Sequence, residues 1–244
     1  MAVNNSAGRL RALLAMMQTQ GHNLAVIDGW IASFSLSHLP NGEADLLVAR
    51  QLLNVRLEVE QLARDLEGRV PDHLTASARS AFLNAISPRI FSQPWANVMQ
   101  HFPPQINTSL DFCVHLLPAD EQEIDVELWN ELRAKVEELR GALDDEKLPT
   151  SLRELIRHHV ELIEDAIQAC RVRGVIRMQV ALDAAGANLA RAEAQLAAYN
   201  GVPAFGRLIS MWQTAQKIGD FALKVEKYSH LALGAKDFVA GLLK

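Results

Sequence analysis

Four side chains that can bind a metal ion or carry a proton follow one another at spacings of four, three and four residues. They are Glu154, His158, Glu161 and Asp165. On an α-helix this spacing puts all four on one face, where they could share a metal ion or a proton. A di-metal bundle needs Glu-x-x-His motifs on two helices, however, and the sequence has no such pair. We therefore favour a solvated face with local ion pairs, and we expect no metal and no cofactor.

Arg153, His158 and His159 suggest a different chemistry. An arginine followed after four to six residues by a histidine resembles the signature of HEPN-type ribonucleases, a family of small all-helical proteins. The resemblance implies a dimer that cleaves RNA without a metal. The histidine would act as general acid and base on the ribose hydroxyl, and the arginine would stabilise the phosphate. On one helix Arg153 and His158 lie about 140° apart around the axis, so the competing interpretation is a surface arginine with a half-buried His159.

The segment that carries these residues, 150–174, has the clearest helix boundaries in the chain. Pro149 precedes it, and Ser151 with Glu154 fits a capping box, in which the two side chains accept from backbone N–H groups of the first turn. Gly174 predicts a left-handed C-cap. Between these ends, apolar residues recur at helical spacing and predict one buried face: Leu152, Ile156, Ile163, Ile167 and Cys170.

Helical spacing of apolar residues extends over nearly the whole chain. Residues 43–67 carry a heptad-like stripe, and residues 125–144 and 176–199 repeat the design of the helix at 150–174. The last apolar series, in 203–243, is so long that a single helix must bend or project from a compact domain. We therefore predict an all-α fold, a multi-helix bundle of roughly eight to ten helices with a long C-terminal helix.

A polar, acidic stretch at residues 118–125 divides this pattern into two parts. We predict an N-terminal helical subdomain over residues 1–118 and a C-terminal helical bundle over residues 119–244, which includes the long terminal helix. The alternative is one continuous domain.

Composition narrows the class of protein further. Hydrophobic residues make up 49% and charged residues 22% of the 244 residues, and the net charge is −5, as in ordinary globular proteins. No basic patch is interleaved with aromatic residues, so we expect no DNA partner. The sequence has no signal-like or membrane-spanning apolar run, and Cys113 and Cys170 form no paired motif. These features favour a soluble cytoplasmic protein with reduced thiols.

The function that fits these patterns best is that of a non-catalytic intracellular interaction or scaffold protein that acts through helix–helix association. We expect it to bind a protein partner or a second copy of itself through residues 203–243, where the apolar stripe contains many small residues. The first alternative is the HEPN-like ribonuclease with Arg153, His158 and His159, for which RNA would be a partner. The second is a membrane-acting helical effector, since residues 203–243 are amphipathic, although the small residues of the stripe favour a protein partner.

Overall fold

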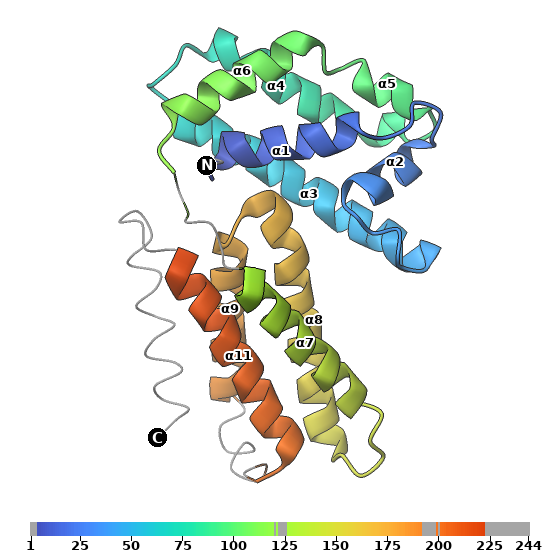
Figure 1. Ribbon diagram of the computed structural model, residues 1–244, viewed down its shortest axis with the longest axis vertical. Coiled ribbons are helices and arrows are strands. Elements are labelled where there is room, and N and C mark those ends of the chain that lie inside the picture. Colours follow the sequence, from blue (N-terminus) through green and yellow to red (C-terminus); the bar gives the residue numbers. More distant parts are fainter. Residues whose placement is uncertain (1–3, 120, 122–125, 192–198, 200, 223–244) are drawn as a thin grey trace. The chain divides into compact units, whose positions relative to one another are not determined.

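The computed structural model describes residues 4–119, 121, 126–191, 199 and 201–222, shown in Figure 1. Within these residues the chain forms ten α-helices and one short 3-10 helix and contains no β-strand, which confirms the predicted all-α fold and number of helices. No helix in this part of the chain is long and apolar enough to cross a membrane. Parts of two predicted features, the stretch at 118–125 and the long C-terminal helix, lie outside the described residues.

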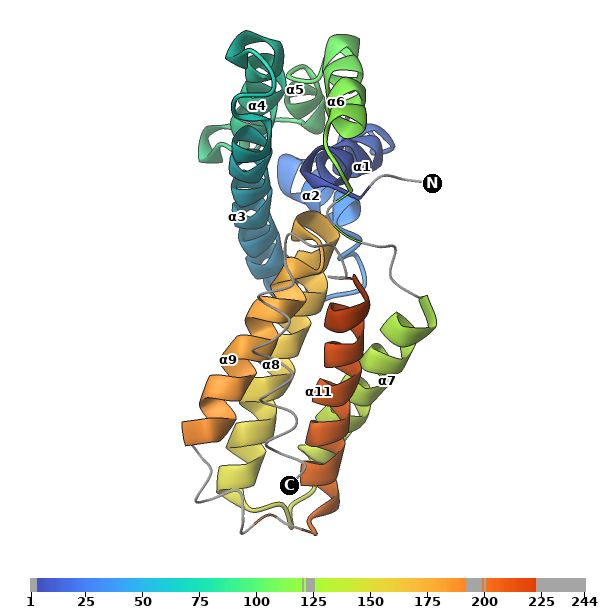
Figure 2. The same cartoon turned by 90° about the vertical axis from the view of Figure 1, so that its left-hand side faces the viewer.

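The chain divides into two compact units with separate cores. The first unit holds residues Met1–Ala119 together with Arg171–Gly174. Within it, α1 packs against α3 and α6, and α4 packs against the same two helices, so that these four form its body (Figures 1 and 2). Its elements are α1 (Ser6–Gln18), α2 (Val26–Ser33), α3 (Asn41–Leu66), α4 (Asp72–Ala85), η1 (Pro88–Ile90), α5 (Trp95–Met99) and α6 (Pro104–Leu116).

Helix α3 owes its position to the heptad-like stripe seen in the sequence. Every residue of that stripe is buried in the core of the first unit, and Gly68, with a φ of 71°, follows the helix in the left-handed region that glycine adopts without strain. The stripe comprises Val48, Leu52, Val55, Val59, Leu62 and Leu66. The helix therefore presents its opposite face outward.

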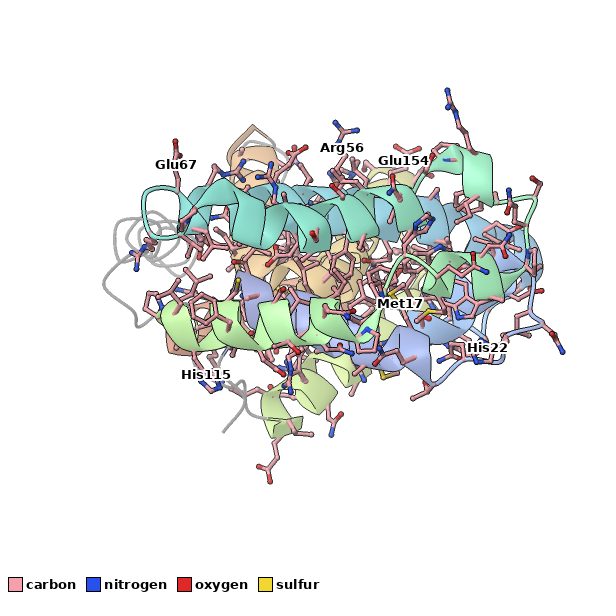
Figure 3. The ribbon with its side chains drawn as sticks, turned by 90° about the horizontal axis from the view of Figure 1, so that it is seen from above. Met17, His22, Arg56, Glu67, His115 and Glu154 are labelled. Atoms are coloured by element: carbon pink, nitrogen blue, oxygen red, sulfur yellow. The ribbon has the colours of Figure 1, made fainter. Side chains whose placement is uncertain are left out.

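Two tryptophans fill the space between α2 and α5. The ring of Trp95 meets that of Trp30 edge-on, with centroids 5.3 Å apart, and its Nε1 donates to the carbonyl oxygen of Met17 at 3.3 Å. Met17 points in among the helices in Figure 3 and is fully buried. Gly29 makes this packing possible, because a Cβ there would lie 2.2 Å from a ring carbon of Trp95.

One buried carboxylate interrupts the apolar core of the first unit. Glu58 of α3 accepts from Nε of Arg9 at 2.7 Å, and its other carboxylate oxygen lies 3.4 Å from Nε of Arg173. Only 1% of the glutamate side chain is exposed. A carboxylate so enclosed needs cationic partners to remain charged, and the two arginines supply them.

The second unit holds Asp120–Cys170 and Val175–Lys244. Its described helices are α7 (Val126–Ala142), α8 (Thr150–Arg173), α9 (Ile176–Arg191) and α11 (Pro203–Ala222). α7 and α9 both pack against α11, and Figure 2 shows α7 beside α11. The last three residues of α8 and Gly174 belong to the first unit.

Both boundaries of α8 agree with the sequence, but the predicted cap at its N-terminus does not. Gly174 has a φ of 68°, which confirms the predicted left-handed C-cap. The predicted capping box is wrong, because the helix already begins at Thr150 and Ser151 lies within its first turn. The Ser151 hydroxyl instead accepts a hydrogen bond from the hydroxyl of Tyr199 at 2.6 Å. Pro149 supplies the carbonyl oxygen for the first backbone bond of the helix, from Arg153 at 2.9 Å.

Candidate functional site

The four metal-binding residue types on α8 share one exposed face. Glu154, His158, Glu161 and Asp165 all point to solvent, and His158 Nε2 lies 2.8 Å from Nδ2 of Asn188 on α9. Among the residues that the structure describes, no three histidine, cysteine or carboxylate side chains are gathered closely enough to hold a metal ion. The arrangement is that of a surface, with one hydrogen bond to the neighbouring helix.

Arg153 and His159 point in different directions from this face. Nη2 of Arg153 donates to the carbonyl oxygen of Asp145 at 2.7 Å, in the loop before the helix. His159 is completely buried, and its ring meets the ring of Trp212 on α11 with centroids 5.7 Å apart. The rings of His158 and His159 are 5.6 Å apart. The structure thus brings the two histidines together but ties Arg153 to a separate contact.

The surroundings of His159 keep its imidazole neutral. Burial in the core, and to a lesser extent the nearby imidazole of His158, lowers the pKa of His159 to about 4. Neither ring nitrogen has a hydrogen-bond partner among the residues that the structure describes. An acid–base catalyst must come within hydrogen-bond reach of its substrate, whereas this ring is enclosed by the side chains of its own bundle.

The first unit contains an apolar groove that runs beside α3. It has a volume of about 620 Å³ and lies between α3 and residues 83–91, at the end of α4 and in η1. We call it the α3 groove. Its apolar walls include Ile27, Leu53, Leu83, Ile86 and Phe91. Its charged residues are Asp45 and Arg56, both on α3.

The outward face of α3 continues the apolar surface of this groove. Leu46 is 69% exposed, Leu53 is 58% exposed, and Ala49 between them is also exposed. The spacing of three and four residues puts these side chains in one row, opposite the buried stripe of the same helix. α3 is therefore apolar on two faces, and only one of them is buried in this chain.

The two charged residues of the groove lie near opposite ends of this row. Asp45 precedes Leu46, and Arg56 follows Leu53 by three residues. Arg56 points outward from the helices in Figure 3, and its Nε lies 3.1 Å from Glu60 one turn further along. Both side chains of that pair are well exposed, so the ion pair contributes little to stability and can be exchanged for another.

A second, polar hollow of about 430 Å³ lies near the end of α4 and borders Ser87, as the α3 groove does. Its walls carry amide side chains together with Arg89 and His101, and no carboxylate. It therefore lacks the paired acid and base that a hydrolytic site uses.

The surface row on α3 was missed in the sequence, where residues 43–67 were assigned a single buried stripe. A signal was nevertheless present, because Leu46 and Leu53 fall outside that stripe and seven residues apart on the same side of the helix. The burial of His159 could also have been predicted, because it lies three residues after Ile156 and four before Ile163, both in the predicted buried face. Its polar side chain obscured that position.

In comparisons with known proteins, no family model, curated protein or solved structure matches this chain. The candidate site consequently rests on geometry and chemistry alone.

Proposed function

We propose that this protein is a non-catalytic helical interaction protein that works by helix–helix association, and that the α3 groove with the exposed row of α3 is its binding surface. The observation that carries the proposal is the exposure of Leu46 and Leu53 beside an apolar groove. Contiguous exposed apolar surface marks sites of protein association. A groove of this kind takes a helix whose apolar residues recur every three and four positions.

The residues Arg153, His158 and His159 of α8 support a catalytic function less well than the α3 groove supports binding. Arg153, His158 and His159 line neither the α3 groove nor the polar hollow beside it. The HEPN-like alternative needs a histidine and an arginine that can reach one phosphodiester, and His159 lies inside its bundle. We therefore expect the purified chain to leave RNA intact.

Association through residues 203–243, as predicted from the sequence, remains a separate proposal. In the described part of that segment, α11, the apolar residues Leu208, Met211, Trp212 and Ile218 are buried in the core of the second unit. Residues 223–243 lie outside the described residues. The α3 groove is favoured because its apolar residues are both described and exposed.

A cytoplasmic location accompanies this proposal. Cys113 and Cys170 are not joined in a disulfide, which suits a reducing compartment. Burial also raises the pKa of the Cys113 thiol, which keeps it protonated and unreactive.

Site-specific photocrosslinking tests the binding surface. A photoreactive phenylalanine derivative is introduced at Leu53 of the full chain, and the cells are irradiated. Phe112 is the matched control position, because it is 55% exposed against 58% for Leu53 and lies in the same unit, on α6. We expect a discrete crosslinked species from position 53 and none from position 112.

A variant of α8 completes the test. Changing Arg153→Ala, His158→Ala and His159→Leu together should leave the crosslink at position 53 unchanged, since none of these residues touches the groove. The proposal fails if position 53 yields no discrete species, or if both positions yield the same products.

A further inference from the structure

We propose that the occupant of the α3 groove is helix α3 of a second copy of this chain, lying antiparallel to the first across a two-fold axis. The inference rests on the proposed function of the same surface and names its partner. It follows from the order of apolar and charged residues along α3.

The two leucines of the apolar row exchange places when the helix is reversed. Leu46 and Leu53 lie at equal distances in sequence from a midpoint beside Ala49. When two copies of α3 run in opposite directions about that midpoint, Leu46 of each copy faces Leu53 of the other. A two-fold axis demands this self-complementarity, because the same patch must serve on both subunits. Ala49 lies where the helices cross, and its small side chain allows them to approach closely.

The charges along the groove match the same arrangement. Asp45 lies at the N-terminal end of the row and Arg56 at the C-terminal end. Reversal of the second helix brings Asp45 of each copy next to Arg56 of the other, so both ends of the interface carry opposite charges. A parallel arrangement would place like charges together at each end. The helix dipoles also favour the antiparallel arrangement, because the positive end of each helix then lies beside the negative end of the other.

The midpoint of the charged pair lies one residue from the midpoint of the leucine pair. Asp45 of one copy and Arg56 of the other are therefore displaced by two residues, about 3 Å along the axis, which the long arginine side chain spans. Arg50, which is exposed near the midpoint, is not part of the groove wall and lies on the other side of the row. On that side the two-fold axis brings it near Arg50 of the second copy, a like-charge contact that the attractive pairs at the two ends must outweigh.

The α3 groove of each copy can accommodate a leucine that projects from the other copy. Leu46 is the most exposed large hydrophobic side chain among the described residues, yet it does not line the groove of its own copy. In the antiparallel pair it projects toward the second copy, where Leu53 and Leu83 provide apolar walls. Each copy thus offers both a projecting leucine and a hollow.

Charge exchange at the two ends tests this geometry. Asp45→Arg alone places arginine against arginine at both ends, and Arg56→Asp alone places aspartate against aspartate. A mixture of the two single variants restores opposite charges at both ends of the heterodimer. The weakening in each single variant reports the antiparallel orientation, because a parallel pair of unaltered chains would already place like charges together. Sedimentation equilibrium of the full chain, whose monomer mass is 27.0 kDa, measures each state over a dilution series.

We expect the unaltered chain to dimerise reversibly and each single variant to dimerise about tenfold more weakly, because two attractive ion pairs become repulsive. The mixture should regain the affinity of the unaltered chain. Leu53→Asp should abolish the dimer, whereas Phe112→Asp should leave it unchanged. Thermal unfolding followed by circular dichroism checks that each variant is folded.

Two outcomes overturn the inference. One is an unaltered chain that stays monomeric at every concentration, and the other is a mixture that associates no better than its components. A monomer that nevertheless gives a discrete crosslink from position 53 to a different polypeptide leaves the proposed function standing and refutes only self-association. A monomer without a crosslink refutes both.

Discussion

Lowering the pH should destabilise the second unit through His159. Its ordinary pKa of 6.5 falls to about 4 in the folded protein, because the buried ring has no room for a hydrated charge. In the unfolded chain the same ring takes up a proton near pH 6.5. Between these two values the unfolded state binds more protons than the folded state, so the free energy of unfolding falls as the pH falls.

The size of the effect follows from the two pKa values. Each pH unit between them costs about 1.4 kcal/mol. At pH 5 the loss is therefore about 2 kcal/mol, and it reaches about 3 kcal/mol once the pH is below the folded value. Above pH 6.5 the residue contributes no pH dependence. A loss of this size is a large part of the stability of an ordinary domain.

Denaturant unfolding at pH 7, 6 and 5 measures this loss when the unaltered chain is compared with His159→Leu. Leucine fills a similar volume and does not titrate, and carboxylates common to both proteins cancel in the difference. Because the ring nitrogens have no partners, we expect the variant to be about 1 kcal/mol more stable at pH 7. Its advantage should grow by about 2 kcal/mol at pH 5.

His158→Gln is the matched control, since His158 is the exposed neighbour of the buried ring. This variant should keep nearly all of the pH dependence. The reasoning is refuted if the difference between the unaltered chain and His159→Leu stays constant from pH 7 to 5. It is also refuted if nuclear magnetic resonance shows the His159 ring titrating near its ordinary pKa.

Two further substitutions test the core of the first unit. Gly29→Ala should cost about 3 kcal/mol or more, because the added methyl would lie 2.2 Å from a ring carbon of Trp95, whereas Gly42→Ala meets no atom within 4 Å and should be neutral or slightly stabilising. Equal thermal unfolding of the two variants would contradict this packing. Glu58→Gln should cost about 3 kcal/mol, since it leaves two arginines without their buried carboxylate, while Glu60→Gln at the surface should cost less than about 1 kcal/mol. Denaturant titration compares the pair, and equal losses would show that burial does not set the cost.

Much of the fold was accessible from the sequence because apolar spacing reports burial directly. The heptad-like stripe of α3 is buried throughout, and Gly174 ends α8 in the left-handed conformation. These features depend on residues close together in the chain. The start of α8 was predicted correctly but its capping box was not, because Ser151 lies within the first turn and its hydroxyl accepts from Tyr199, a residue far away in sequence.

The polar residues inside the cores were much harder to predict. Glu58 lies three residues after Val55 and four before Leu62, in the buried stripe of α3. A charged residue at such a position is ordinarily assigned to the surface, because burial without a partner is so costly. Two arginines offset the cost of burying this charge. Arg9 and Arg173 are 49 and 115 residues away in sequence, and only the folded chain brings them to Glu58. The α3 groove likewise combines segments that no local pattern connects.

The position of Arg173 also constrains how the chain is made. The first unit includes residues 171–174, yet the ribosome completes residues 1–119 earlier by the time needed to add more than fifty amino acids. At ordinary elongation rates that interval is on the order of seconds, which is long compared with the folding of a small helical domain. During this interval Glu58 has Arg9 but not Arg173. The ion pair between Glu58 and Arg173 can therefore form only after translation has supplied the second arginine, and a fragment ending at residue 119 would lack it.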